Sequence, residues 1–130
     1  MKAKTQSLGQ LELEVLRIVW DKQGCTVLEA AEVLAKQNGY ARTTILTVMQ
    51  RLHKKGFLSR KKEEGVFHYY STEKKTTVMG KLARQFVENI FEGSSASLVQ
   101  HLTSGDLSAE ELERIRKVID DALAGEGAKE

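Results

Sequence analysis

Apolar residues recur every three to four positions along most of this chain, which predicts a mainly helical protein. A first helix is expected from Ser7, which has capping-box spacing to Gln10, to about Lys22. A second helix is expected from a capping box at Thr26 and Glu29 to the Asn38-Gly39 pair. The first 40 residues therefore predict two short amphipathic helices.

A third helix followed by a β-hairpin is predicted for residues 41–71. The helix is expected to run from Ala41 to Lys55 and to stop at Gly56, and it has one apolar face made of Ile45, Val48, Met49 and Leu52. The period of the pattern then changes to two, with a turn expected near Glu63-Glu64-Gly65. The order helix, helix, helix, hairpin is typical of a winged helix-turn-helix.

The helical period returns after Thr76 and continues in three segments separated by glycines. A first segment ends at Gly93, a short helix is expected around residues 96–102, and Gly105 separates it from the last helix. That last helix is opened by a capping box at Ser108 and Glu111. Residues 125–130 are expected to be frayed. The boundaries predicted are therefore 1–75 for the winged-helix domain, 76–125 for a helical domain and 126–130 for a tail.

Charge is distributed unevenly along the chain. Residues 41–75 hold nine basic and three acidic side chains, a net +6, whereas the whole chain is only +2. Residues 76–130 hold six basic and ten acidic side chains, a net −4. A helix and a hairpin that share a positive field are suited to a polyanion, while an acidic tail with apolar stripes is suited to packing on itself or on a partner. The pattern indicates two separate tasks within one chain.

In a helix-turn-helix, the second helix supports a third that enters the major groove of DNA. The threonines at the start of the third helix can contact base edges, and the basic residues further along can contact phosphates. The predicted recognition-helix contacts are Arg42, Thr43, Thr44, Leu46, Thr47, Gln50, Arg51 and Lys54, and the predicted wing contacts are Arg60, Lys61, Lys62 and His68.

Other functions have less support in the sequence. A winged helix can also dock an acidic protein partner, and this alternative stays open at this point. RNA binding usually needs exposed aromatic platforms, and the aromatic residues here are few. The three histidines are scattered, and neither a phosphate loop nor a nucleophile motif is present, so we expect no metal, no cofactor and no enzymatic activity. Cys25 is alone and is expected to be a small buried residue, which together with the lack of a signal peptide or membrane span favours the cytoplasm.

These residues resemble the penicillinase-repressor (BlaI/MecI) family of bacterial winged-helix regulators. The matching segments are Leu8 to Glu12, Trp20, Thr43 to Leu58, the wing strand Phe67 to Ser71, and Asp106 to Ser108 with the acidic helix that follows. The resemblance covers nearly the whole chain. It implies a repressor that binds double-stranded operator DNA as a homodimer through its N-terminal domain.

The resemblance also implies roles for the C-terminal helices and for a partner. The dimerisation residues are expected to be Met79, Leu82, Phe86, Ile90, Leu98, Leu102, Leu112, Ile115 and Ile119. A membrane sensor-protease is a further partner that the resemblance admits, although the segment Val99 to Thr103 lacks the Asn-Phe pair that is cut in antibiotic-resistance members. Thr43 and Leu46 also depart from the basic residues usual in the family, so the resemblance implies the docking mode and does not supply the operator sequence.

Overall fold

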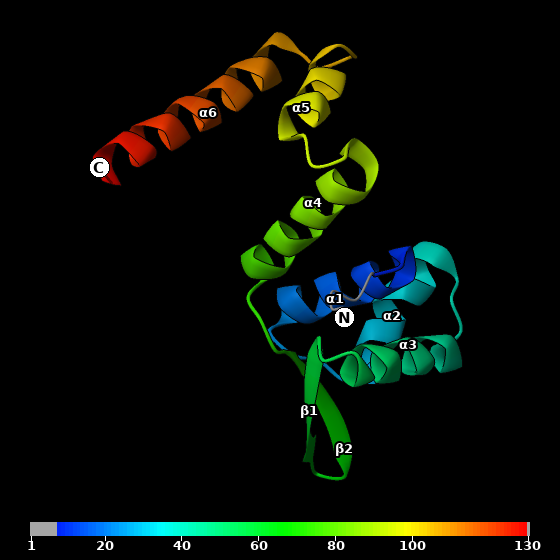
Figure 1. Cartoon of the computed structure of the whole chain (residues 1–130). Helices are drawn as coiled ribbons and strands as arrows, with labels where there is room; N and C mark the ends of the chain where they lie inside the picture. Colours follow the sequence, from blue (N-terminus) through cyan, green and yellow to red (C-terminus); the bar gives the residue numbers. More distant parts are fainter. Residues whose placement is uncertain (1–7, 130) are drawn as a thin grey trace. The chain divides into compact units, whose positions relative to one another are not determined.

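The computed structural model describes residues 8–129, without the side chains of residues 127–129. The chain divides after Leu82 into two compact units, and each is considered by itself. The elements, in chain order, are α1 (Gln10–Lys22), α2 (Val27–Asn38), α3 (Arg42–Lys54), β1 (Leu58–Glu63), β2 (Val66–Ser71), α4 (Lys75–Phe91), α5 (Ser95–Thr103) and α6 (Ala109–Lys129) (Figure 1). The predicted fold class, mainly helical with a small β wing, is confirmed.

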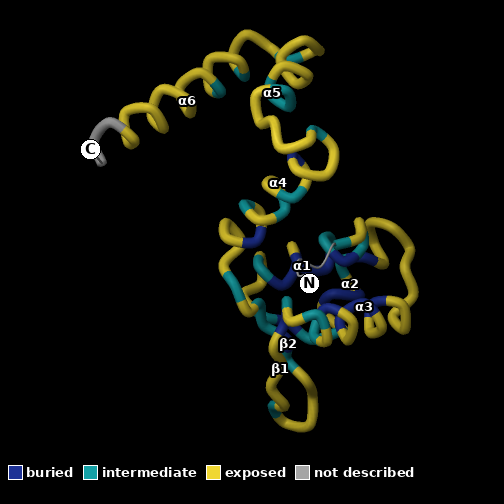
Figure 2. The backbone as a smooth tube through the Cα atoms, in the orientation of Figure 1, coloured by how far each residue is buried: buried dark blue, intermediate teal, exposed yellow. Residues whose placement is uncertain are grey.

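The first unit is built around one apolar core beneath three helices and the base of the hairpin. Every apolar residue predicted to line the inner face of α3 is buried. Figure 2 shows how each of α1, α2 and α3 turns a buried side inward and an exposed side outward. The core residues contributed by several elements are Val15, Leu16, Val19, Ala30, Leu34, Ile45, Met49, Leu52, Leu58, Tyr69 and Val78.

The helix starts show which capping predictions hold. At α2 the capping box is complete, since the Glu29 N–H donates to the Thr26 hydroxyl at 3.1 Å and the Thr26 N–H donates to the Glu29 carboxylate at 2.8 Å. The expected cap of α1 is wrong in position: the helix begins at Gln10, after Gly9, and Ser7 lies outside the described residues. Glu12 caps the start of α1 instead: its carboxylate accepts from the Gly9 N–H at 2.8 Å and so satisfies an otherwise unpaired donor.

The wing is a two-stranded antiparallel sheet with a two-residue turn. Glu64 and Gly65 both have positive φ, 51° and 79°, which is the backbone of a type I′ turn and matches the right-handed twist of the strands. The register pairs Arg60 with Tyr69 and Lys62 with Phe67, so each of these pairs shares one face of the hairpin.

The hairpin is attached to the helices by a short backbone bridge. Cys25, between α1 and α2, donates to the Tyr69 carbonyl at 3.0 Å and accepts from the Tyr69 N–H at 2.8 Å. The Trp20 indole N–H donates to the Ser71 hydroxyl at 2.9 Å beside this bridge. These bonds fix the base of the wing against α1, and the free end of the hairpin extends beyond it (Figure 1).

The second unit begins within α4, and one prediction needs correction here. Leu82, one of the residues expected to contribute to dimerisation, is half-buried and packs against the core of the first unit, on the same side of α4 as Val78 one turn earlier. The tail expected to be frayed instead continues α6 to Lys129, because a helical glycine costs only about 1 kcal/mol and need not end a helix. None of the described helices is both long and apolar enough to cross a membrane.

Gly24 is placed where a side chain would collide with the wing. Its φ is +108°, and an added Cβ would lie 2.3 Å from the Tyr70 ring. We expect Gly24→Ala to lower the free energy of unfolding by about 2–4 kcal/mol through backbone strain and overpacking, as measured by chemical denaturation. Gly39→Ala is the matched control, because Gly39 also has positive φ, +74°, but open space around it. Equal losses in the two variants would show that the contact between Gly24 and Tyr70 is unimportant.

Candidate nucleic-acid interface

The outward face of α3 carries a row of polar side chains. Thr43, Thr47, Gln50 and Lys54 are all exposed and, at spacings of three and four, share the side of the helix opposite its buried residues. Thr44 and Arg51 are also exposed and flank this row on one side, while Arg42 and Leu46 flank it on the other. All eight residues predicted for the recognition helix are therefore accessible to a ligand.

One hydroxyl in this row is already engaged. The Thr47 hydroxyl donates to the Thr43 carbonyl at 3.1 Å, one turn earlier in the helix. Its proton is therefore unavailable to an external acceptor, but its oxygen lone pairs and its methyl group still face outward. Thr47 is thus suited to accept a hydrogen bond, or to make an apolar contact, at a base edge.

A groove of about 530 Å³ separates α3 from the wing. Its lining comes from the capped start of α2 (Thr26, Val27, Leu28), from α3 (Arg42, Thr43, Leu46, Gln50), and from both strands and the turn of the hairpin (Arg60, Gly65, Val66, Phe67, Tyr69). Four predicted recognition residues and one predicted wing residue therefore share a single concavity. Leu28, Val66 and Phe67 were not predicted from the sequence, because the prediction of this site relied on basic and polar residues and not on apolar ones.

The wing cations are divided between the two faces of the hairpin. The Arg60 guanidinium lies 4.2 Å from the centre of the Phe67 ring, and the Lys62 ammonium lies 5.5 Å from it. Lys61 pairs with His68 on the opposite face, where the His68 ring lies 3.4 Å from the Glu63 carboxylate. The structure therefore brings Arg60 and Lys62 together and separates Lys61 and His68 from them, because neighbouring strand residues point to opposite sides.

A buried carboxylate connects the start of α1 to the end of α3. The Glu12 side chain is only 7% exposed, and Lys55 contacts both of its oxygens at 3.0 Å while Arg51 lies 3.9 Å away. Burial by itself would raise the pKa of Glu12. The Gly9 N–H and the two cations outweigh that effect and hold the pKa below its ordinary value of 4.5.

This cluster changes the predicted role of Arg51. Its side chain is 52% exposed, so it can still reach a phosphate, but Glu12 offsets part of its charge. The sequence offered a weak signal for this, since Glu12 has helical spacing to the apolar residues Leu8, Val15 and Leu16. Nothing in the pattern identified its partners 39 and 43 positions away.

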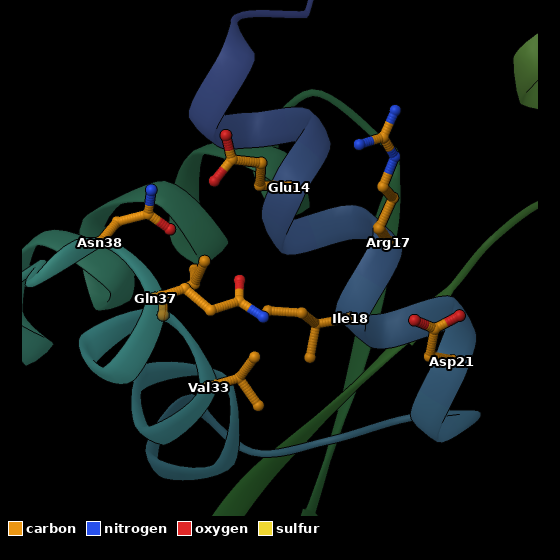
Figure 3. Close-up of a pocket in the computed structure, with 8 residues that line it drawn as sticks. Glu14, Arg17, Ile18, Asp21, Val33, Gln37 and Asn38 are labelled. Atoms are coloured by element: carbon orange, nitrogen blue, oxygen red, sulfur yellow. The ribbon is translucent and has the colours of Figure 1, made fainter.

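A second groove, of about 420 Å³, lies between α1 and α2 and contains none of the predicted site residues. Figure 3 shows Glu14, Arg17 and Asp21 on α1, with Gln37 extending from α2 toward Ile18. Both signs of charge are present in this groove, which does not favour binding of a polyanion.

Among the described residues no group of three His, Cys, Asp or Glu side chains is placed to hold a metal. Burial, with a smaller effect of Glu29, raises the pKa of the Cys25 thiol to about 11, so it is not a reactive thiolate.

Comparison with known proteins assigns this geometry to a family. The family model described as penicillinase repressor matches residues 8–121. The chain belongs to the penicillinase repressor family. The methicillin resistance regulatory protein MecI of Staphylococcus aureus strain N315 is 32% identical over 120 residues, covering 92% of this chain and 98% of MecI. The penicillinase repressor of Bacillus licheniformis is 27% identical over 119 residues, covering 91% and 93% of the two chains.

A solved structure supports the same assignment for the N-terminal unit. The solution structure of the DNA-binding domain of the repressor BlaI matches with a TM-score of 0.51 and 31% identity, covering 58% of this chain and 92% of that domain. The protein is therefore a DNA-binding transcriptional repressor. The alternative of a module that docks an acidic protein is not favoured.

The Glu12 cluster predicts a measurable dependence of stability on pH. Because the pKa of Glu12 is lower in the folded than in the unfolded state, its contribution is present above pH 4.5 and is lost as pH falls through the folded value. We expect Glu12→Gln to lower the free energy of unfolding at pH 7 by about 1–3 kcal/mol and to flatten its decline below pH 4.5. Denaturation series at several pH values measure both effects.

The control for this prediction is Glu14→Gln on the same helix. The Glu14 carboxylate accepts from the exposed Gln10 amide at 3.1 Å, so the change removes a similar charge with little effect on packing. Unchanged stability of Glu12→Gln at pH 7 would show that the ion pairs do not hold α1 to α3.

Proposed function

We propose that this repressor binds a near-palindromic operator as a homodimer, with one α3 in the major groove of each half-site and each wing beside the adjoining backbone. The observation that supports this most is the groove bounded by α3 and by the Arg60 side of the wing. A helix of 13 residues flanked by a cationic ribbon has the dimensions and the charge for a duplex. Half-site centres are then about 34 Å apart, one helical turn.

Different residues serve affinity and specificity in this arrangement. Thr43, Thr47 and Gln50 occupy the outward row of α3 and are assigned to base edges. Arg42, Lys54, Arg60 and Lys62 are assigned to phosphates, because long cationic side chains at the rim of the contact neutralise the backbone without reading sequence. Lys61 and His68 lie on the other face of the wing and are assigned at most to an adjoining phosphate.

Dimerisation is assigned to the helices after the winged helix. Many of their apolar side chains remain exposed within the single chain: Met79, Phe86, Ile90, Leu102, Leu112, Val118, Ile119 and Leu123. Val118 and Leu123, 68% and 67% exposed, extend the set that the sequence predicted. So many apolar groups left in water favour a second copy as the surface that covers them.

The proposed repressor is cytoplasmic, and a membrane sensor-protease is the partner proposed to release it from the operator. Residues 99–103, which by resemblance correspond to the segment cut in antibiotic-resistance members although they lack its Asn-Phe pair, are in α5. Proteases bind extended substrates, so cleavage here requires α5 to unfold locally first. A cut at this point separates α6 from the winged helix and so weakens the dimer.

Removing a phosphate-contacting charge should reduce the salt dependence of binding. If each protomer neutralises about four phosphates, the slope of log affinity against log salt is near −7 for the dimer. We expect Lys62→Gln to make this slope less steep by about 2, one contact per protomer, and to weaken binding to all duplexes alike. Fluorescence anisotropy on a random-sequence duplex at a series of salt concentrations measures the slope.

The matched control is Arg17→Gln, which removes one charge from the α1–α2 groove. It should leave the slope unchanged. If Arg17→Gln and Lys62→Gln reduced the slope equally, binding would depend on net charge alone and the wing would have no defined contact.

Placing a charge on the apolar face of α6 should prevent dimer formation. We expect Ile119→Glu to yield a monomer at micromolar concentration, because a carboxylate would have to be buried at the interface. Analytical ultracentrifugation gives the mass, and a gel shift on a two-half-site duplex should show loss of cooperative binding. Ala124→Glu, which adds the same charge on the opposite side of α6, should remain dimeric. A dimeric Ile119→Glu variant would place the interface elsewhere.

A further inference from the structure

The groove between α3 and the wing has apolar walls that remain exposed in an otherwise well-packed unit. Leu28, Leu46, Val66 and Phe67 are 51%, 38%, 50% and 38% exposed, and all four line this groove. Within the described part of the first unit, the remaining exposed large apolar residues are Tyr40 and Met79. Apolar side chains gathered in one concavity indicate a contact surface, whereas single ones scattered over a surface do not.

The position of Leu46 on α3 separates it from the core. Ile45 and Met49, its neighbours on the inner side, are completely buried, while Leu46 lies at the edge of the outward row beside Thr43 and Gln50. Its side chain therefore adds nothing to the buried core and is presented to whatever occupies the groove. A leucine cannot donate to or accept from a base, so any readout that it performs is apolar.

The occupant has to combine negative charge with an apolar group. Arg42 and Arg60 line the same groove, and Phe67 is held by the Arg60 and Lys62 cations on its ring. These cations match the phosphates of a DNA strand, and in the major groove the apolar group on a base edge is the C5-methyl of thymine.

We propose that Leu46 is a specificity-determining residue that reads a pyrimidine C5-methyl group in each operator half-site. This rests on the docking of α3 in the major groove proposed above. Leu46 excludes water from the methyl group and contributes no hydrogen bond, so the preference is for thymine over an unmethylated pyrimidine at one position. Burial of one methyl group corresponds to about a fourfold change in affinity per half-site, or about sixteenfold when both half-sites of a dimer change together.

The test uses the full chain and a duplex selected by it from a random-sequence pool. Each thymine of the selected duplex is replaced by uracil, symmetrically in the two half-sites, which removes the methyl group and leaves base pairing intact. We expect one symmetric pair of replacements to weaken binding about sixteenfold in an anisotropy titration, and the others to have smaller effects. In the same titrations, the Leu46→Ala variant should bind the selected duplex and its uracil-substituted form with nearly equal affinity.

Two further variants identify the residue responsible. Leu46→Met keeps an apolar side chain, so replacing thymine by uracil should still weaken its binding by most of the sixteenfold factor. Leu28→Ala, on another wall of the groove, should show the full sixteenfold loss. Circular dichroism checks that each variant is folded, and an exposed position on α3 should tolerate these changes.

The possible failures are distinguishable. If the selection recovers no duplex, docking on DNA fails and the role of Leu46 fails with it. If a duplex is recovered and binding depends on salt, but no thymine is sensitive to uracil or the penalty persists in Leu46→Ala, then docking stands and methyl readout by Leu46 is wrong.

Discussion

The pair of backbone hydrogen bonds between Cys25 and Tyr69 is the constraint on which the proposed binding face depends. One wall of the groove is a helix and the other is a hairpin, and a two-stranded hairpin by itself is marginally stable in water. Joining its base to the loop between α1 and α2 fixes the second wall relative to the first. Tyr69 is almost wholly buried at this joint, so the side chain that anchors the wing also belongs to the core. The shape of the interface is thus determined by the packing of the domain.

The charges of the first unit are also organised by packing. Glu12 neutralises part of the positive end of α3, because Lys55 and Arg51 lie against it, and it holds the first helix to the third. Arg42 and Lys54, by contrast, are exposed on the outer side of α3. A count of basic residues in the sequence therefore overstates the positive charge that the first unit presents on its surface.

Much of the fold could be predicted from the sequence because its signals are local. Helical spacing identified the buried face of α3, the Thr26–Glu29 pair marked the start of α2, and the change to a period of two located the hairpin. The candidate site was predicted less completely. Lys61 and Lys62 are adjacent in sequence, so composition grouped them, but strand geometry places them on opposite faces. Leu28 and Phe67 line the same groove as Leu46 only through the tertiary fold, and the helical spacing alone did not show that Leu82 packs against the core of the first unit.

The tight turn of the hairpin has a consequence for how the wing approaches a duplex. Glu63 and Glu64 lie at that turn, so the extremity of the ribbon is anionic although its flanks are cationic. Phosphates on both edges of a minor groove would repel a probe that entered end-first. We therefore expect the hairpin to lie sideways along one DNA strand. The outer limits of the operator then depend on how far the hairpin extends along the axis of the DNA, and not on how deeply it enters a groove.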